Sequence, residues 1–242
     1  MRGVILAAGM AKRLRPLTDD RPKCLLSLGG KTLLERTVDA MCAAGVDSLL
    51  VVIGYRGEMI RDFISQHYPH LPVDYLDNTD YAHNNNIFSL WMAVDYLREE
   101  TFLLMDSDIF CDPMAVRCVA QMPGNALALN RHELGEEEMK VVVNADNQIT
   151  QISKTCAIAD AVGESVGIEK ISAAYCKALY EELRQMIVVE GLIDVFYELA
   201  FERLIPKGHT FEVVDTTAYF SYELDTVEDF HLAQQMIETP KR

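Results

Sequence analysis

The stretch LAAGMAKRLRPLTDDRPKCLL, residues 6–26, lies between a short apolar run that begins at Gly3 and an amphipathic stretch over residues 33–44. A strand followed by a long helix is typical of an open α/β sheet, where ligands bind in the loops at the carboxyl ends of the strands. Small side chains let the backbone of such a loop approach an anion, whose oxygens its N–H groups can hold. We therefore expect this loop to bind a triphosphate through Leu6, Ala7, Ala8, Gly9, Met10 and Ala11.

Two basic residues of the same stretch, Arg13 and Lys23, would add positive charge where pyrophosphate leaves. A glycine-rich turn alone would fit a solvent-exposed loop about as well. The combination of a strand, a small-residue turn, an arginine and a later Pro22-Lys23 is much rarer. The loop is neither a G-x-x-x-x-G-K-[ST] P-loop nor a G-x-G-x-x-G dinucleotide fingerprint.

Outward from this loop, short apolar runs alternate with amphipathic stretches as far as residue 105. Strand, helix and strand at this spacing imply right-handed crossovers and a parallel sheet with helices on both faces. The fold class that we expect is α/β, with a Rossmann-like, mixed but mostly parallel sheet flanked by helices. Expected strands span residues 3–6, 49–53, 73–76 and 102–105, and expected helices span 33–44, 58–67 and 88–97.

From about residue 124 the strand-like runs come closer together, and the turn Asn144-Ala-Asp-Asn147 joins two of them. Such spacing indicates antiparallel pairing, so we expect a small antiparallel elaboration. No linker rich in proline or glycine interrupts the chain, which predicts a single domain over residues 1–242. Expected strands span residues 126–129, 140–143, 149–152, 211–214 and 218–221, and expected helices span 173–188, 193–204 and 226–237.

The composition narrows the range of partners. The 242 residues include 37 Asp and Glu against 22 Lys and Arg, for a formal net charge of −15. This charge repels nucleic-acid phosphates, so nucleic acid is not an expected partner. Apolar runs are too short for membrane insertion or a signal segment, and the six cysteines form no C-x-x-C pair. We expect a cytoplasmic protein with reduced thiols, either a monomer or a homodimer.

Two carboxylates, Asp106 and Asp108, follow the apolar run that ends at Met105. Unpaired carboxylates are costly to bury at the end of a strand, so they either face solvent or hold a cation. Beside a triphosphate the natural cation is Mg²⁺. A turn-capping role is about equally consistent with an isolated D-x-D pair.

The pattern Leu6-Ala-Ala-Gly-x-x-x-Arg13 followed by Pro22-Lys23 resembles the signature loop of the sugar-phosphate and alcohol-phosphate nucleotidyltransferases. The resemblance implies transfer of a nucleoside monophosphate from an NTP to a small acceptor, with release of pyrophosphate. It also implies catalytic roles for Arg13 and Lys23. Residues 1–123 would mainly bind the NTP and residues 124–242 mainly the acceptor.

The same resemblance implies a Mg²⁺ cofactor held by Asp108 and Asp225, with Asp106 on the nucleotide side. Asp225 lies where the last expected strand passes into the last expected helix. Either Asp225 or Thr226 could instead cap that helix. Both roles are compatible with the sequence at this position.

The segment Asn78-x-x-Tyr81-x-x-x-Asn85-Asn86-x-x-Ser89 is similar to one in the bacterial CTP:phosphocholine and 2-aminoethylphosphonate cytidylyltransferases. Hexose-1-phosphate enzymes usually have a Gly-Thr-Ala type of segment there, which this sequence lacks. Amide side chains offer donors and acceptors to a pyrimidine edge, although asparagines also form turns and cap helices. The resemblance implies CTP as the nucleotide, bound with help from Asn78, Asn85, Asn86 and Ser89.

The segment from Glu190 to Glu198 resembles a helix that lines the acceptor pocket of these cytidylyltransferases, where an acidic and an aromatic residue face an amine. This implies that Asp194 and Tyr197 bind an ammonium group, for which a carboxylate beside an aromatic ring is suited. Tyr197 would fit an ordinary amphipathic helix about as well. Glu169 is a further acidic candidate. Lys154 is a candidate for the acceptor's phosphate or phosphonate, or is a solvated lysine.

Residues 135–139 lack the tryptophan expected of a cage for a quaternary ammonium. A primary ammonium carries N–H donors and needs hydrogen-bond acceptors, so the acidic candidates favour 2-aminoethylphosphonate over phosphocholine. The expected function is therefore a Mg²⁺-dependent cytidylyltransferase for a small amino-alcohol phosphate or phosphonate. Two alternatives remain: a hexose-1-phosphate nucleotidyltransferase, and a non-catalytic nucleotide-binding protein.

Overall fold

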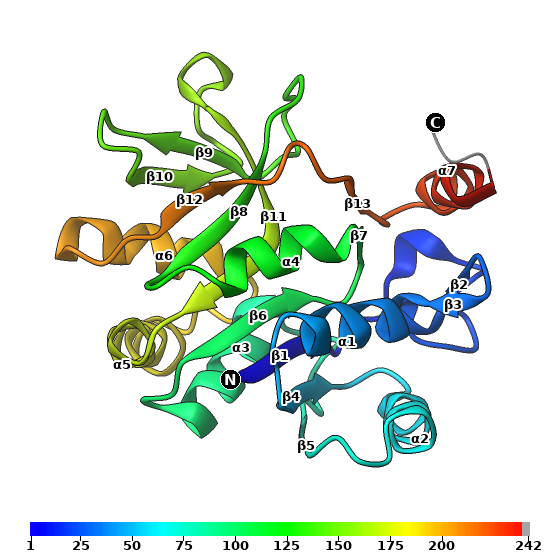
Figure 1. The fold of residues 1–242 in the computed structure, drawn as a ribbon. Coiled ribbons are helices and arrows are strands. Elements are labelled where there is room, and N and C mark those ends of the chain that lie inside the picture. The colour runs from blue at the N-terminus through cyan, green and yellow to red at the C-terminus, as the bar shows by residue number, and fades with distance from the viewer. Residues whose placement is uncertain (239–242) are drawn as a thin grey trace.

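Four parallel strands form one half of the central sheet in the computed structural model, which describes residues 1–238 (Figure 1). The strand that precedes the LAAG loop lies inside this group, with one parallel neighbour on each side. The arrangement confirms the predicted parallel α/β sheet. In sheet order the strands are β6 (Phe102–Asp106), β1 (Arg2–Ala7), β4 (Ser48–Ile53) and β5 (Val73–Asp77).

The other half of the sheet is mainly antiparallel, as expected for the second half of the chain. β11 (Gly163–Ile171) runs antiparallel to β6 and also pairs with β8 (Ala126–Asn130). The hairpin of β9 (Lys140–Val143) and β10 (Ile149–Ser153) continues from β11, and β12 (Glu212–Asp215) lies parallel to β8. The nine strands follow the order β10-β9-β11-β6-β1-β4-β5, with β8 and β12 branching at β11.

Helices cover both faces of the sheet, and each face buries an apolar core (Figure 1). One face carries α3 (Asn86–Leu97), α5 (Ala173–Arg184) and α6 (Glu198–Leu204). The opposite face carries α1 (Leu33–Ala43), α2 (Gly57–His67) and α4 (Pro113–Ala120). Within residues 1–238, no helix combines the length and apolarity needed to cross a membrane.

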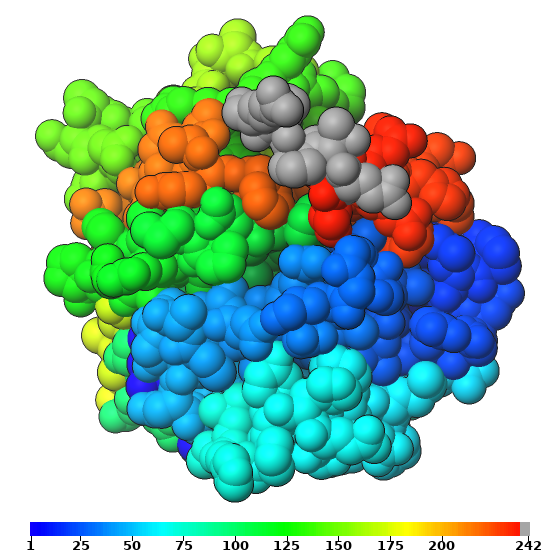
Figure 2. Space-filling model, turned by 45° about the vertical axis from the view of Figure 1, so that its right-hand side comes forward, coloured from blue at the N-terminus to red at the C-terminus, as the bar shows by residue number. Residues whose placement is uncertain are grey.

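The last segment of the chain returns to the loops that follow β1 and β6. β13 (Ser221–Glu223) pairs with β7 (Ile109–Cys111), and α7 (Val227–Glu238) packs near the hairpin of β2 (Ser27–Leu28) and β3 (Lys31–Thr32). Figure 2 shows this C-terminal segment, in red, against the blue N-terminal one. Short helical turns occur at Lys12–Leu14, Lys23–Leu25, Ile158–Asp160 and Ile205–Lys207, and a π-helical turn, Gln185–Val189, extends α5.

Side-chain caps fix where several helices begin. The Thr32 hydroxyl accepts a hydrogen bond from the backbone N–H of Glu35 at 3.0 Å and starts α1. The Asp112 carboxylate accepts from the N–H of Met114 at 2.8 Å, ahead of α4. Each cap satisfies a backbone donor that has no partner inside its helix.

Several elements differ from the sequence predictions, among them the short strands β2, β3 and β7, which were not predicted. β11 and α4 were not predicted, because glycines and charged residues interrupt the first and α4 is only eight residues long. The helix expected from residue 193 begins at Glu198, and the strand expected over 218–221 lies at Ser221–Glu223. These shifts decide which side chains reach the site.

Candidate active site

The loop after β1 presents unused backbone donors. The N–H groups of Gly9, Met10 and Ala11 donate to no acceptor within residues 1–238. A Cβ placed on Gly9 would meet no atom of residues 1–238 within 4 Å, so the described chain leaves the space beside it open. Ala11 has a φ of 45°, a left-handed conformation that turns the chain sharply after Gly9. This loop, which we call the donor loop, therefore offers the N–H groups of residues 9–11 to an anion, as its sequence predicts.

Lys23 lies between two carboxylates that come from distant parts of the chain. Its ammonium donates to Asp108 Oδ2 and to Asp225 Oδ1, both at 3.0 Å. Burial lowers the pKa of Lys23, but the charges of Asp108 and Asp225 outweigh burial and raise the pKa above its usual value. Arg13 donates to the other oxygen of Asp225 at 2.5 Å. The structure thus brings together the predicted catalytic and metal-binding residues.

A third carboxylate, Glu223, completes this group. Oxygen atoms of Asp108, Glu223 and Asp225 lie within 4.8 Å of one another. Burial, together with the charges of Asp108 and Asp225, raises the pKa of Glu223 to about 8. Carboxylate oxygens are the protein ligands that Mg²⁺ prefers. The donor set therefore fits a Mg²⁺ ion.

Thr226, not Asp225, takes the capping role at the start of α7. The backbone N–H of Thr226 donates to Asp229 Oδ2 at 2.7 Å, and the N–H of Asp229 donates back to the Thr226 hydroxyl at 3.2 Å. This reciprocal pair satisfies the end of the helix. The carboxylate of Asp225 is left to face Lys23 and Arg13.

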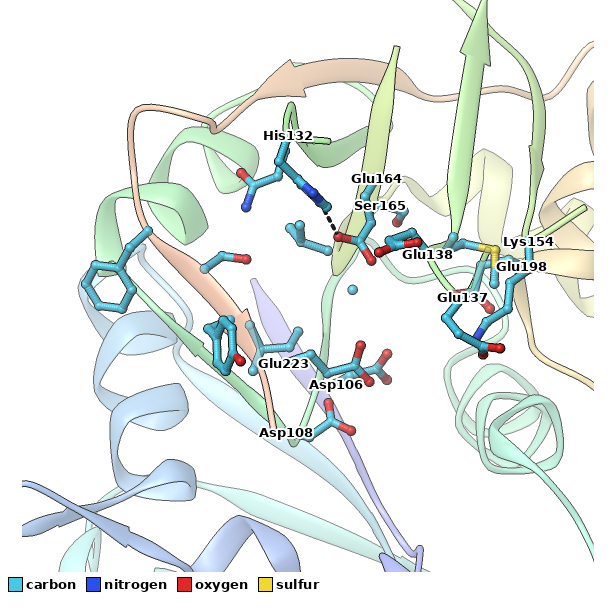
Figure 3. Close-up of a pocket in the computed structure, with 18 of the residues that line it drawn as sticks. Asp106, Asp108, His132, Glu137, Glu138, Lys154, Glu164, Ser165, Glu198 and Glu223 are labelled. Atoms are coloured by element: carbon cyan, nitrogen blue, oxygen red, sulfur yellow. Dashed lines mark hydrogen bonds and ion pairs between the residues drawn. The ribbon is translucent and has the colours of Figure 1, made fainter. Parts of the chain in front are cut away.

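A cavity of about 600 Å³ extends from Asp108 toward the antiparallel half of the sheet (Figure 3). Acidic side chains outnumber basic ones on its walls. Lys154 lies at the far end, with its ammonium 3.6 Å from Glu137 and 4.8 Å from the centre of the Phe196 ring. The acidic residues that line the cavity are Asp106, Asp108, Glu137, Glu138, Glu164, Glu198, Glu223 and Asp229.

Glu198 lines this cavity from the first turn of α6. The residue is only 7% exposed, and its Oε2 atom has no hydrogen-bond partner within residues 1–238. Burial raises the pKa of Glu198 to about 7. A buried carboxylate without a partner is costly, so this wall of the cavity is suited to a cationic ligand.

Asp106 forms part of the cavity floor, and the buried Tyr197 lies behind it. The Tyr197 hydroxyl donates to Asp106 Oδ2 at 3.0 Å. Burial and the charges of Asp108 and Glu169 raise the pKa of Asp106 well above its ordinary value. Glu169 is fully buried behind this floor, and neither of its carboxyl oxygens has a hydrogen-bond partner within the described chain.

A family model for the MobA-like NTP transferase domain matches residues 3–199. The chain belongs to this family. The match covers the donor loop, Lys23 and Asp108, and it ends near the start of α6.

Curated relatives of this MobA-like NTP transferase align over different lengths. The chain is 36% identical over 106 residues to a 2-aminoethylphosphonate cytidylyltransferase of Lancefieldella rimae, which is 44% of the chain and 42% of the relative. It is 26% identical over its whole length to the CMP-5'-(3-aminopropyl)phosphonate synthase of Streptomyces rubellomurinus, but spans 39% of that protein. The chain thus matches less than half the length of either relative.

Solved structures share the fold of the chain. The CTP:phosphocholine cytidylyltransferase of Streptococcus pneumoniae superposes with a TM-score of 0.83 at 23% identity, over 98% of both chains. A UDP-glucose pyrophosphorylase gives a TM-score of 0.80 at 15% identity, over 99% of both chains. The likeness confirms the nucleotidyltransferase fold expected from the signature loop.

The asparagine segment forms structural hydrogen bonds around the start of α3. Asn78 is 1% exposed, and its amide donates to Asn84 and to Ser89, so Asn78 and Ser89 hold the turn before α3 from inside. Asn85 caps α3 by accepting from the N–H of Asn86 at 2.8 Å. Of the four predicted residues, only Asn86 lines the cavity. Asn78 and Ser89 are buried, and their assignment as nucleotide contacts stays a prediction.

The predicted acceptor residues also divide. Lys154 lines the cavity, but Asp194 is exposed and does not. Tyr197 and Glu169 lie beneath the cavity wall and do not line it. The reason for the shift is that α6 begins at Glu198, so the residue one turn after Asp194 reaches the cavity in its place.

The sequence prediction did not include two candidate functional residues, Glu223 and Glu198, although their spacing from predicted residues points to them. Glu223 and Asp225 are two positions apart, and side chains two apart in an extended segment share one face. That spacing could have identified Glu223 as the third carboxylate. Glu198 lies one helical turn from Asp194, but only the start of α6 distinguishes the two.

Proposed function

We propose that this protein is a Mg²⁺-dependent cytidylyltransferase that transfers CMP from CTP to a small amino-alcohol phosphate or phosphonate and releases pyrophosphate. One observation carries the proposal. A single cavity joins Asp108 and Glu223, at the donor-loop end, to Lys154 and Glu198 at the other. A metal-nucleotide complex and a zwitterionic acceptor could therefore occupy one space in contact with each other (Figure 3).

The chain's own residues suit an in-line displacement at the α-phosphorus of CTP. The acceptor oxygen is already ionised at neutral pH, so no general base is needed and the protein's task is positioning and charge stabilisation. Lys23 and Arg13 supply positive charge beside the donor loop. Asp108, Asp225 and Glu223 would hold Mg²⁺, which when bound neutralises phosphate charge.

The opposite end of the cavity supports an acceptor with a primary amine. Glu198 offers a buried oxygen without a partner, and a primary ammonium can donate hydrogen bonds to it. Lys154 offers a cation to a phosphate or phosphonate. The names of the two curated relatives, a 2-aminoethylphosphonate cytidylyltransferase and a CMP-5'-(3-aminopropyl)phosphonate synthase, favour the phosphonate. We therefore propose 2-aminoethylphosphonate ahead of phosphocholine.

A hexose-1-phosphate nucleotidyltransferase is the second candidate. The chain is 33% identical over 110 residues to a UTP–glucose-1-phosphate uridylyltransferase of Haloferax volcanii. The acidic cavity does not favour an uncharged sugar ring, which gains nothing from Glu198.

The cytidylyltransferase proposal also includes a division of the chain, in which residues 1–123 mainly bind the nucleotide and residues 124–242 mainly bind the acceptor. It further includes a cytoplasmic location and a monomeric or homodimeric state.

Pyrophosphate release tests the proposal directly. Each of the four NTPs with Mg²⁺ is combined with 2-aminoethylphosphonate, phosphocholine, phosphoethanolamine or glucose 1-phosphate. We expect release with CTP and an amino acceptor. Release with a sugar phosphate alone would overturn the acceptor assignment, and CTP binding without release would indicate a non-catalytic nucleotide-binding protein.

A further inference from the structure

The loop between β8 and β9, residues 131–139, forms one wall of the cavity (Figure 3). We call it the acceptor loop. Glu137 and Glu138 project from it, and a carboxylate oxygen of Glu137 lies 3.6 Å from the ammonium of Lys154, the residue that follows β10. The loop contains no helix or strand, so regular backbone pairing does not hold it. Something else must fix the positions of its carboxylates.

Lys140, the first residue of β9, supplies that support. It is 1% exposed, and its ammonium donates to the carbonyl oxygens of Gly135, Glu136 and Glu138 at 3.1, 3.1 and 3.3 Å. These three acceptors match the three N–H donors of an ammonium. Lys140 forms no ion pair among residues 1–238. The free-energy cost of burying its charge is therefore offset by hydrogen bonds to carbonyl groups of this loop.

The carbonyl groups that face Lys140 determine where the side chains point. With three carbonyls turned toward the buried ammonium, the intervening Glu137 faces outward to Lys154. Glu138 closes the turn from the inside, because its carboxylate accepts from the N–H of Gly135 at 2.8 Å. At the other end of the loop, His132 contacts Glu164 of β11 at 2.8 Å. The loop is thus held at both ends, and Lys140 holds the part that carries Glu137.

We propose that Lys140 is a positioning residue for the acceptor, which keeps the acceptor loop in the conformation that presents Glu137 to Lys154. The inference rests on the proposed function only in taking the cavity as the acceptor site. Lys140 touches neither the donor loop nor the carboxylates around Lys23. Its removal therefore affects the acceptor and not the nucleotide.

The chain offers a matched control in Lys170. This lysine also donates to backbone carbonyls, those of Ala120 and Met122, where α4 ends. Neither carbonyl belongs to a residue that lines the cavity. Lys140→Met and Lys170→Met remove the same kind of contact. An effect that both variants show is therefore a general loss of stability, and an effect that only Lys140→Met shows belongs to the site.

The test compares both variants with the wild type in steady-state kinetics and in hydrogen exchange of residues 131–139. We expect Lys140→Met to raise KM for the acceptor by about tenfold to a hundredfold, with KM for CTP unchanged within about twofold. Amide exchange in the acceptor loop should accelerate in Lys140→Met alone. Lys170→Met should leave both measurements at the wild-type values.

Unchanged exchange in the acceptor loop of Lys140→Met would overturn the inference, whichever acceptor the protein uses. An equal rise in KM for CTP and acceptor would also overturn it, because it would show a general disturbance. If the wild type turned over only a sugar phosphate, the proposed function would fail. The exchange measurement and the KM for that acceptor would still decide the role of Lys140.

Discussion

At the scale of single residues, Lys23 stands where a divalent cation would meet Asp108 and Asp225. Lys23→Met removes the charge but keeps most of the side chain's length. We expect kcat to fall by about 10²–10³-fold, because a preorganised charge at the phosphates is lost. We also expect nucleotide-free protein to bind Mn²⁺ more tightly, since the ammonium no longer occupies the carboxylates. Pyrophosphate release and Mn²⁺ titration by electron paramagnetic resonance measure the two effects.

The exposed Lys12 of the same loop provides the control. Lys12→Met changes the net charge equally and should leave both kcat and Mn²⁺ binding near their wild-type values. A parallel fall of kcat, Mn²⁺ affinity and melting temperature in Lys23→Met would contradict the assignment, because it would indicate a structural role.

The raised pKa of Glu198 predicts that activity with an amino acceptor depends on pH. Its pKa of about 7 means that the carboxylate, which an ammonium ligand needs, forms as the pH rises through 7. An alkyl ammonium stays protonated over this range. We therefore expect kcat/KM for an amino acceptor to rise between pH 6 and 8. In Glu198→Gln it should be about ten- to a hundredfold lower and lose that rise. A rise that persists in the variant would assign the titration to another group.

The same raised pKa makes the free energy of unfolding fall as the pH rises. Folding favours the protonated form of Glu198, so its contribution is complete below its unfolded pKa near 4.5 and is lost as the pH rises through about 7. Glu198→Gln lacks this titration. Relative to the wild type, the variant should gain roughly 1–3 kcal/mol in free energy of unfolding between pH 4.5 and 8. Urea unfolding at several pH values measures the difference, and a constant difference would refute it.

At the scale of elements, the bulge in β11 shapes the cavity floor. Gly167 has a φ of 69°, and a Cβ there would lie 3.0 Å from both Asp106 Oδ2 and Ile109 Cδ1. Gly167→Ala should therefore cost about 1–2 kcal/mol in free energy of unfolding from backbone strain, and should lower kcat by displacing Asp106. Chemical unfolding and turnover test the two effects.

Gly124→Ala is the matched control, because a Cβ at Gly124 meets no atom of the described residues within 4 Å and its φ is not positive. It should change neither stability nor turnover appreciably. If both alanine variants behaved like the wild type, the bulge would not constrain Asp106.

Elements with a regular apolar pattern could be predicted, and those shaped by the site could not. The run before Gly9 and the run ending at Met105 gave the parallel strands, because buried strands are continuously apolar. β11 instead carries Glu164 and Gly167, which line the cavity, and the buried Glu169, and these residues break the strand pattern. Likewise, the resemblance to a family signature brought Lys23, Asp108 and Asp225 together in the prediction. Whether the side chain of Glu198 reaches the cavity depends instead on where α6 begins. That start is set by tertiary contacts such as the hydrogen bond from the Tyr197 N–H to Asn86.

At the scale of the whole molecule, the site ties together parts of the chain that lie far apart in sequence. Lys23 contacts Asp108 across 85 positions and Asp225 across 202. The C-terminal segment is held there by the β13–β7 pairing and by the apolar cluster that includes Phe230 and Leu14. A ligand that bridges these parts stabilises the folded chain by mass action, since the unfolded chain cannot assemble them.

This linkage predicts how ligands change the melting temperature. CTP at a hundred times its dissociation constant should add about 2.7 kcal/mol to the free energy of unfolding, which raises the melting temperature by about 5–11 °C for a chain of this size. The shift in melting temperature with CTP and Mg²⁺ together should exceed the sum of the shifts with Mg²⁺ alone and with CTP plus a chelator. The reason is that Lys23 holds Asp108 and Asp225 until the phosphates of CTP attract its ammonium, and only then can the metal bind these carboxylates and Glu223. Asp225→Asn should abolish the excess. Additive shifts in the wild type, measured by differential scanning fluorimetry, would show that metal and nucleotide bind independently.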